Sequence, residues 1–346
     1  MIKLFAVLLI IQSLALPVSA LTLEAPSVPS EAEALMPRST ESFSDGITEL
    51  LQNTLESMRP DVLEAIQICI GMIASVLIVS TLDCFSDNVK KTADLTGTAV
   101  IAGTLLLNTR SMIRLSVHTI QELSSYGKLL FPVMTTAMAA QGGITSSAAL
   151  YVGTAVFDTI LTECILRFLI PMVYLFLVLA IANSAVGEDL LKRLRDLLKT
   201  AVSWCIKTIL TVFTTYMSIT GVVSGTTDAA ALKATKVAIS SVVPVVGSIL
   251  SDASEAVLVS AGVAKNAAGI YGILAMFAIG LQPFLKIGMH YLLLKATGAV
   301  CTIWGTKGIT SLMEDFSTAM GLLLGMTGGT CLLTLISTIC FLKGVG

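Results

Sequence analysis

Three ionisable residues interrupt an apolar part of this sequence, and their types and spacing could do chemistry. Asp158, Glu163 and Arg167 lie within the segment 148–185. Glu163 and Arg167 are four residues apart, so in a helix they share a face and can form an ion pair. Ionisable residues at membrane depth are costly, and they usually face a bundle interior or a water-filled path. The cluster therefore predicts either a transport site or a structural ion pair.

Further charged residues lie within or at the edges of other apolar stretches. Lys207 occurs alone in one stretch, and Lys286, His290 and Lys295 flank or enter two more. A transport pathway could use them. The simpler interpretation is that each lysine keeps its stem in the apolar region while its ammonium group reaches the membrane surface.

Motifs for catalysis are missing from the sequence. The two histidines, His118 and His290, have no nucleophile motif beside them. Residues 304–310 lack the GxxxxGK spacing of a phosphate-binding loop, and neither HExxH nor a dinucleotide fingerprint occurs. The seven cysteines include no CxxC pair, and most occupy apolar runs, as packing residues do. We expect no enzymatic activity, no metal and no cofactor.

The composition indicates where these residues are placed. Hydrophobic residues make up 55% of the 346 residues and charged residues 13%, whereas soluble domains carry about 25% charged residues. Too few charges remain to cover a water-exposed surface, so lipid is the expected surroundings. No basic patch with interleaved aromatic residues occurs, so nucleic acid is not expected as a ligand. The predicted fold class is an all-α, polytopic membrane helix bundle.

The N-terminal part differs from the rest. Residues 1–20 are predicted to be a secretory signal peptide, because Lys3 precedes a short apolar core and Ala20 ends a small-residue cleavage pattern. The alternative is an uncleaved first membrane helix, for which the stretch is short. Residues 21–60 form an acidic leader outside the cytoplasm. One amphipathic helix near its end would lie on the membrane or meet a partner.

Apolar runs fill the remainder and predict six to nine spans, beginning with an N-terminal membrane hairpin at 61–128. Two runs are short and contain a proline, Pro132 and Pro244. A helix of about 13 residues rises about 20 Å, less than the hydrocarbon core of about 30 Å. Each is therefore either a half-helix broken inside the membrane or a span kinked by its proline. The runs are 62–82, 95–107, 129–140, 148–161, 165–185, 201–223, 237–250, 267–285, 287–303 and 320–342.

Residues 129–236 and 237–346 are interpreted as two copies of one membrane repeat. Three pairs of segments match at nearly constant separation: 144–153 with 263–272, 172–177 with 289–294, and 194–201 with 312–319. Pro132 and Pro244 precede the two copies. Internal duplication is typical of transporter-like and channel-like bundles. Chance similarity between apolar segments is the alternative.

Charges and glycines suggest orientation and packing. Residues 186–200 carry four basic residues on an apolar-striped helix, so we expect this segment to lie along the cytoplasmic surface. The counterpart 304–319 has fewer positive charges, which hints at an inverted second copy, although a parallel repeat fits almost as well. Glycine pairs spaced four apart let helices approach closely; they are Gly221 with Gly225 and Gly321 with Gly325.

The most specific motif lies in the second copy. Residues 243–247 read Val-Pro-Val-Val-Gly, Asp252 follows within Ser-Asp-Ala, and Lys265 precedes Asn. This pattern resembles the stage III sporulation protein AE family, and the resemblance extends over roughly residues 60–343. It implies a multi-pass protein of the mother-cell membrane around the forespore. It also implies a complex with other sporulation membrane proteins that acts as a channel or feeding apparatus after engulfment. The family offers no established site residues, so roles for Pro244, Asp252 and Lys265 are our hypothesis.

Three functional hypotheses follow. The first is a membrane subunit of a conduit between mother cell and forespore, with a partner that supplies energy. The second is an autonomous secondary transporter that uses Asp158, Glu163 or Lys207. The third is a scaffold that assembles partners without conducting. A homo-oligomer is compatible with each.

Overall fold

The computed structural model of the protein describes residues 26–37, 43–82, 87–140, 144–186, 188–219, 267–303 and 307–344. The secondary structure in these ranges is helical, as the sequence predicts. The elements in chain order are α2 (Ser30–Glu33), α3 (Phe43–Ser57), α4 (Arg59–Leu82), α5 (Asp87–Ala140), α6 (Ile144–Cys164), the π-helical turn η1 (Ile165–Leu169), α7 (Ile170–Val186), α8 (Asp189–Ile219), α11 (Ala267–Cys301) and α12 (Lys307–Gly344). The signal-peptide prediction, Pro244, Asp252, Lys265, Gly221 and Gly225 lie outside the described residues.

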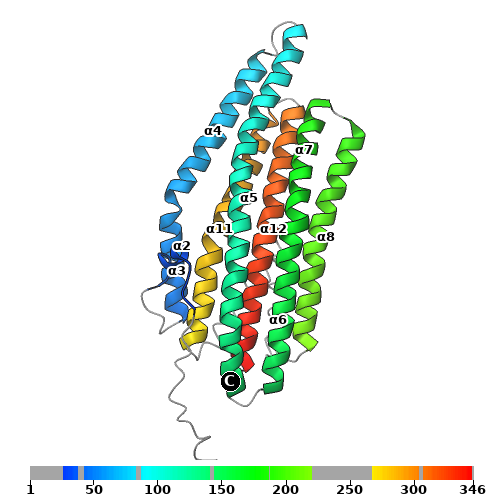
Figure 1. Cartoon of the computed structure of the whole chain (residues 1–346). Coiled ribbons are helices and arrows are strands. Elements are labelled where there is room, and N and C mark those ends of the chain that lie inside the picture. Colours follow the sequence, from blue (N-terminus) through cyan, green and yellow to red (C-terminus); the bar gives the residue numbers. More distant parts are fainter. Residues whose placement is uncertain are drawn as a thin grey trace, which may run out of the picture.

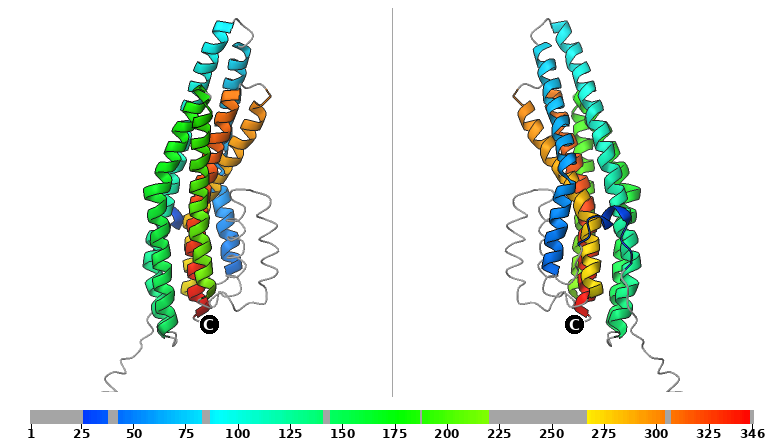
Figure 2. Two further views of the ribbon diagram at one scale, coloured as in Figure 1. Left: turned by 90° about the vertical axis from the view of Figure 1, so that its right-hand side faces the viewer. Right: turned by 90° about the vertical axis from the view of Figure 1, so that its left-hand side faces the viewer.

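The long helices stand side by side in an up-and-down bundle (Figure 1). Helices α4, α6–α7 and α11 run toward one end, and α5, α8 and α12 return from it. The hairpin of α4 and α5 projects past the other helices at that end (Figure 2). At about 1.5 Å per residue, the 54 residues of α5 span about 80 Å, so α5 exceeds any bilayer thickness.

Helix α12 forms the centre of the bundle. It contacts α5, α6, α7, α8 and α11. In its most apolar 18-residue stretch, 89% is buried inside the protein, whereas the buried share of the corresponding stretch is 22–56% in the other four apolar helices. Its residues are apolar or small almost all round, the pattern of a helix enclosed by others. The core therefore lies along α12, and the surrounding helices turn one face toward it.

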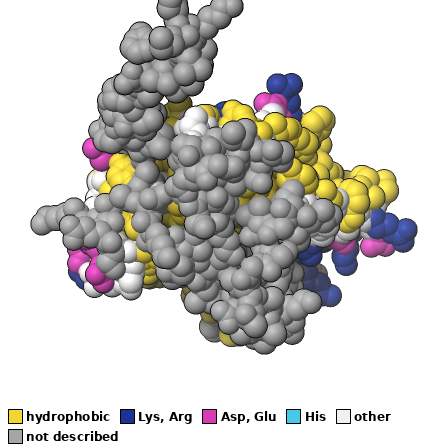
Figure 3. Space-filling view, turned by 90° about the horizontal axis from the view of Figure 1, so that it is seen from below, with side chains coloured by type: hydrophobic (Ala, Val, Ile, Leu, Met, Phe, Trp, Pro, Cys, Tyr) yellow, Lys and Arg dark blue, Asp and Glu magenta, His cyan; other side chains and the backbone are white. Residues whose placement is uncertain are grey.

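Five helices among the described residues are long and apolar enough to cross a membrane. They cover Arg59–Thr81, Leu150–Val186, Asp189–Met217, Gly269–Cys301 and Lys307–Leu342. Their outward faces carry large apolar side chains, such as Phe168, Val178 and Trp204, each more than 60% exposed. Seen along the bundle in Figure 3, hydrophobic side chains cover one described flank, and charged side chains gather at its outer edge. The membrane class is thus supported, whereas the predicted count of six to nine spans is not confirmed.

Several predicted breaks between runs are continuous helix in the structure. Helix α11 joins the runs 267–285 and 287–303, because the lysine between them has a partner within the bundle. The runs 148–161 and 165–185 join through η1. Pro171 has no N–H for the Arg167 carbonyl, and the wider π turn ahead of it accommodates that loss.

The prediction of a helix broken at Pro132 is not confirmed. Pro132 lies inside α5, which continues to Ala140, and its neighbour Phe131 stacks on Phe341 of α12 with ring centroids 5.7 Å apart. Packing on the central helix holds the chain helical through the proline. The predicted boundary between 128 and 129 consequently falls within one helix. Residues 186–200 were predicted as a separate surface helix, but α8 runs unbroken from Asp189 into the bundle.

The two proposed copies run in the same direction. Helices α8 and α12 run parallel, because Arg195 contacts Asp315 and, further along both helices, Leu210 lies against Gly329. Helices α6–α7 and α11, which precede them, also run parallel to one another. The inverted arrangement is therefore wrong for the described residues. The duplication itself stays a prediction.

The acidic leader folds onto the outside of the bundle. Helix α3 buries Phe43, Gly46 and Leu50, and both α2 and α3 contact α11. The Gly46 Cα lies so close to Leu274 that an added Cβ would be 2.9 Å from its Cδ1. The sequence left the membrane or a partner open for this amphipathic helix. In the structure one side of it packs on this chain's own α11, while Leu55 remains 60% exposed.

One pair of cysteines provides a test of the packing of α6 against α8. The Sγ atoms of Cys164 and Cys205 are 3.3 Å apart. In a variant that keeps only these two cysteines, mild oxidation is expected to link them. After cleavage at a protease site inserted between α7 and α8, the two fragments should stay joined until a thiol is added. A variant that keeps Cys164 and Cys301 should separate; its cross-linking to the same extent would contradict this packing.

Candidate functional site

The Asp158 carboxyl is enclosed between α6 and α5. The residue is 2% exposed, and its Oδ2 accepts a hydrogen bond of 2.7 Å from the Ser124 hydroxyl. Among the described residues, its Oδ1 has no hydrogen-bond partner, and neither has the hydroxyl of Thr162, one helical turn further along α6. Two buried, unsatisfied oxygens therefore share one face of α6.

Glu163 and Arg167 form an ion pair, but they do not share the site of Asp158. The Glu163 side chain is 50% exposed and that of Arg167 is 73% exposed. Five residues advance a helix by about 140°, so Glu163 lies far round the helix from Asp158, whereas Arg167 is about one turn beyond Glu163. The structure thus divides the predicted cluster into a buried carboxyl and an outward ion pair. An exposed pair of this kind contributes at most about 1 kcal/mol.

The other predicted residues occupy different places. Lys207 is exposed about midway along α8, and both interpretations of this lysine stay predictions. Pro132 is half-buried in α5. Gly321 and Gly325 are buried on α12, and Gly321 faces the ring of Tyr291, where an added Cβ would be 3.3 Å away.

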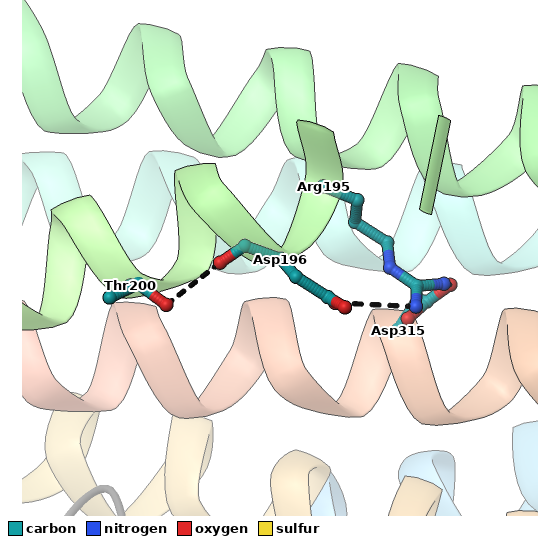
Figure 4. A network of polar contacts seen from close by, with 4 residues as sticks. All are labelled: Arg195, Asp196, Thr200 and Asp315. Atoms are coloured by element: carbon teal, nitrogen blue, oxygen red, sulfur yellow. Dashed lines mark hydrogen bonds and ion pairs between the residues drawn. The ribbon is translucent and has the colours of Figure 1, made fainter. Parts of the chain in front are cut away.

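A buried ion pair joins α8 to α12, and it was missed from the sequence. Arg195 donates from Nη1 to Asp315 Oδ2 over 2.5 Å, and both side chains are 9% exposed. Asp196 Oδ1 lies 3.4 Å from Arg195 Nη2, and the Thr200 hydroxyl donates to the Asp196 carbonyl. Figure 4 shows these four residues. The sequence signal that could have revealed this pair is the opposite charge of Arg195 and Asp315, which occur in the matching segments 194–201 and 312–319.

A second interhelical pair joins α4 to α11. Lys286 Nζ donates to Asp61 Oδ1 over 2.7 Å, and His290, which is 6% exposed, places Nδ1 2.9 Å from the Lys286 carbonyl. The sequence singled out Lys286 and His290 but left Asp61 unassigned. This pair connects the N-terminal hairpin to the second proposed copy.

Several hydroxyl side chains on the central helix have hydrogen-bond partners, whereas the buried Ser317 hydroxyl has none among the described residues. Thr330, Thr334 and Thr338 hydrogen-bond carbonyls of their own helix, and Thr327 bonds Ser116 of α5 over 2.8 Å. Within the described ranges, no three His, Cys, Asp or Glu side chains come together as metal ligands do. The interior is thus apolar with isolated polar contacts. Among the described residues, two buried ionisable side chains have an oxygen without a partner, the Asp158 carboxyl and the Tyr126 hydroxyl, and Asp158 is the acid of the two.

The comparisons with known proteins now identify the family. Residues 33–344 match the family described as Stage III sporulation protein AE. This chain belongs to that family. A curated member, Stage III sporulation protein AE of Bacillus subtilis (strain 168), is 22% identical over 205 residues, which make up 59% of this chain and 51% of that protein. The chain thus spans about half the length of the curated relative it matches. No solved structure matches significantly.

Family membership confirms the resemblance that the Pro-Val-Val-Gly motif suggests. The match begins within the leader, before residue 60, and so includes α3. It assigns a membrane-embedded sporulation protein with several apolar helices. It assigns no role to any single residue, so the polar contacts described above carry the chemical argument.

Proposed function

We propose that this protein is an integral membrane component of a channel or feeding complex between mother cell and forespore, required after engulfment. Its membrane is the mother-cell membrane around the forespore, and its leader lies outside the cytoplasm after signal cleavage. Membership of the stage III sporulation protein AE family is the observation that carries this proposal. The apolar outer faces of five helices support residence in a bilayer.

The bundle itself supports a component rather than a complete machine. Helix α12 fills the central axis, and 89% of its most apolar stretch is buried inside the protein. A pore through a single chain would therefore have to displace that helix. The sequence has no nucleotide-binding motif, and the proposal therefore assigns energy supply to other membrane proteins of the complex. A passage would be formed between chains, either copies of this one or partner subunits.

Deletion of the gene tests the proposal directly. We expect forespores that complete engulfment but stop developing, with late forespore gene expression lost. Expression of the full-length chain from the mother cell should restore spores, whereas expression confined to the forespore should not. Normal spore counts in a clean deletion would overturn the proposal, and restoration from the forespore alone would overturn the assigned membrane.

An autonomous transporter is a second candidate, because Asp158 is a buried carboxyl with an unsatisfied oxygen. Ion-driven uptake into vesicles that contain only this protein would favour it. A scaffold predicts instead that Asp158→Asn, Lys207→Met and Pro244→Ala leave sporulation intact while changes at packing glycines abolish it. Loss of sporulation in Asp158→Asn, with the protein present at normal level, would exclude the pure scaffold.

A further inference from the structure

Asp158 and Asp315 are two buried carboxyls in one bundle with different charge compensation. Asp315 is 7% exposed and has Arg195 at ion-pair distance. Asp158 is 2% exposed, and among the described residues its hydrogen-bond partner is a neutral hydroxyl, that of Ser124. A carboxylate out of water is costly unless a positive charge or several donors compensate for it. Within the described part of the chain, Asp158 lacks that compensation.

Among the described side chains, the charged groups on the elements around α6 do not supply it. On α5, Lys128 acts on Asp158 electrostatically, but its side chain is exposed and forms no ion pair with it. Arg167 of η1 is paired with Glu163. On α8, Lys207 is exposed, and Arg195 is committed to Asp315. On α12, Glu314 and Asp315 lie near the N-terminal end of the helix. Both are acidic, so neither can supply a positive charge.

The unsatisfied atoms lie together on one helix face. Asp158 Oδ1 and Thr162 Oγ1, one turn apart on α6, are buried, and the described part of the chain offers neither of them a partner. Ser124 on α5 already holds the other carboxyl oxygen. Carboxylate and hydroxyl oxygens are hard ligands, which suit a proton or an alkali cation and not a soft metal. Buried acidic residues of membrane bundles commonly serve such ions.

We propose that Asp158, with Ser124 and Thr162, forms a binding site for a monovalent cation, either a proton or a sodium ion. The cation neutralises the carboxylate and binds to Oδ1, the oxygen that has no partner among the described residues. Its release leaves a charged group between α5 and α6, so binding is coupled to the closeness of these two helices. This proposal can be tested separately from the proposed conduit role, because cation binding at Asp158 is measured on the purified protein.

A hydrophobic carbodiimide tests the site, because it reacts with protonated carboxyls in apolar surroundings and leaves an acylurea adduct. In the full chain, purified in detergent without sodium, we expect an adduct on Asp158 that declines as the pH rises. Replacing choline with sodium at constant ionic strength should lower it severalfold if sodium is the ligand, and leave it unchanged if the proton is. The Asp158→Asn variant should lack the adduct, and this loss would assign the adduct to Asp158.

Three controls decide whether the geometry is responsible. Asp315, buried but paired, should remain unmodified. Ser124→Ala removes the hydroxyl that donates to Asp158 Oδ2, a donor that favours the ionised carboxylate, so labelling of Asp158 at a given pH should increase. Ser125→Ala, at the exposed neighbouring serine, should not change the labelling. The proposal is overturned if Asp158 stays unmodified from acidic to alkaline pH in both salts, or if it reacts no faster than Asp315.

Discussion

Replacing Arg195 with methionine is expected to lower the free energy of unfolding by about 3–5 kcal/mol, because Asp315 would be left buried without its cation. The pair is 2.5 Å long with both side chains 9% exposed, so water cannot readily replace the guanidinium. Methionine keeps most of the side-chain volume, and the loss therefore reports charge rather than packing. Unfolding by sodium dodecyl sulfate in mixed micelles, followed by circular dichroism, measures the change.

Asp315→Asn should cost less than Arg195→Met. Asp196 Oδ1 already lies 3.4 Å from Arg195 Nη2, so a second carboxylate can hold the arginine. The matched control is Arg193→Met, an identical substitution two residues away at an exposed position, which should change stability by no more than about 0.5 kcal/mol. Equal effects at 193 and 195 would contradict the buried pair.

The double variant Arg195→Met with Asp315→Leu separates the value of the pair from the cost of breaking it. Because an apolar pair needs no desolvation of charge, its stability should return to within about 1–2 kcal/mol of the original protein. The pair would then serve mainly to fix the register between α8 and α12. If the double variant is as unstable as Arg195→Met, the guanidinium has a further partner.

The sequence was sufficient for the class of fold and for the family, because both depend on properties that many residues share. Apolar runs and scarce charge require helices in lipid, whatever their contacts. The Glu163–Arg167 pair was predictable for a similar reason, since spacing along one helix determines it.

Contacts between helices were not predictable in this way. Arg195 was assigned to a cytoplasmic surface helix, and its partner 120 residues further on could be found only once α8 and α12 were adjacent. The broken helix that was one of two interpretations at Pro132 is not confirmed, and the runs on either side of Lys286 form one helix, for a related reason. A proline or a charge interrupts an isolated apolar run, but neighbouring helices can hold the chain helical and supply a partner.

The packing glycines illustrate the same limit. Spacing of four singled out Gly321 and Gly325, yet the closest approaches to α12 come from Gly269 and Gly280 of α11, eleven residues apart. Eleven residues make about three turns, so both lie on one face. No short motif marks this spacing, and only the antiparallel pairing of α11 with α12 reveals it.

Gly280→Leu is expected to destabilise the protein by about 1–3 kcal/mol or more, because α11 and α12 touch at this point. A Cβ added at Gly280 would lie 2.4 Å from Cys331 Sγ and 3.7 Å from Leu123 of α5, so the larger side chain has no direction in which to move. Gly103→Leu on α5 is the matched control, since nothing lies within 4 Å of its added Cβ.

Loss of glycine from a helix is favourable in itself, so Gly103→Leu should raise stability by up to about 1 kcal/mol. The smaller change Gly280→Ala isolates the contact with Cys331. Combining it with Cys331→Ala removes the obstructing sulfur and should recover a large part of the loss, whereas the same partner change should give Gly280→Leu little relief. Destabilisation by Gly103→Leu equal to that by Gly280→Leu would show that glycine itself, and not the close approach of α11 to the central helix, accounts for the effect.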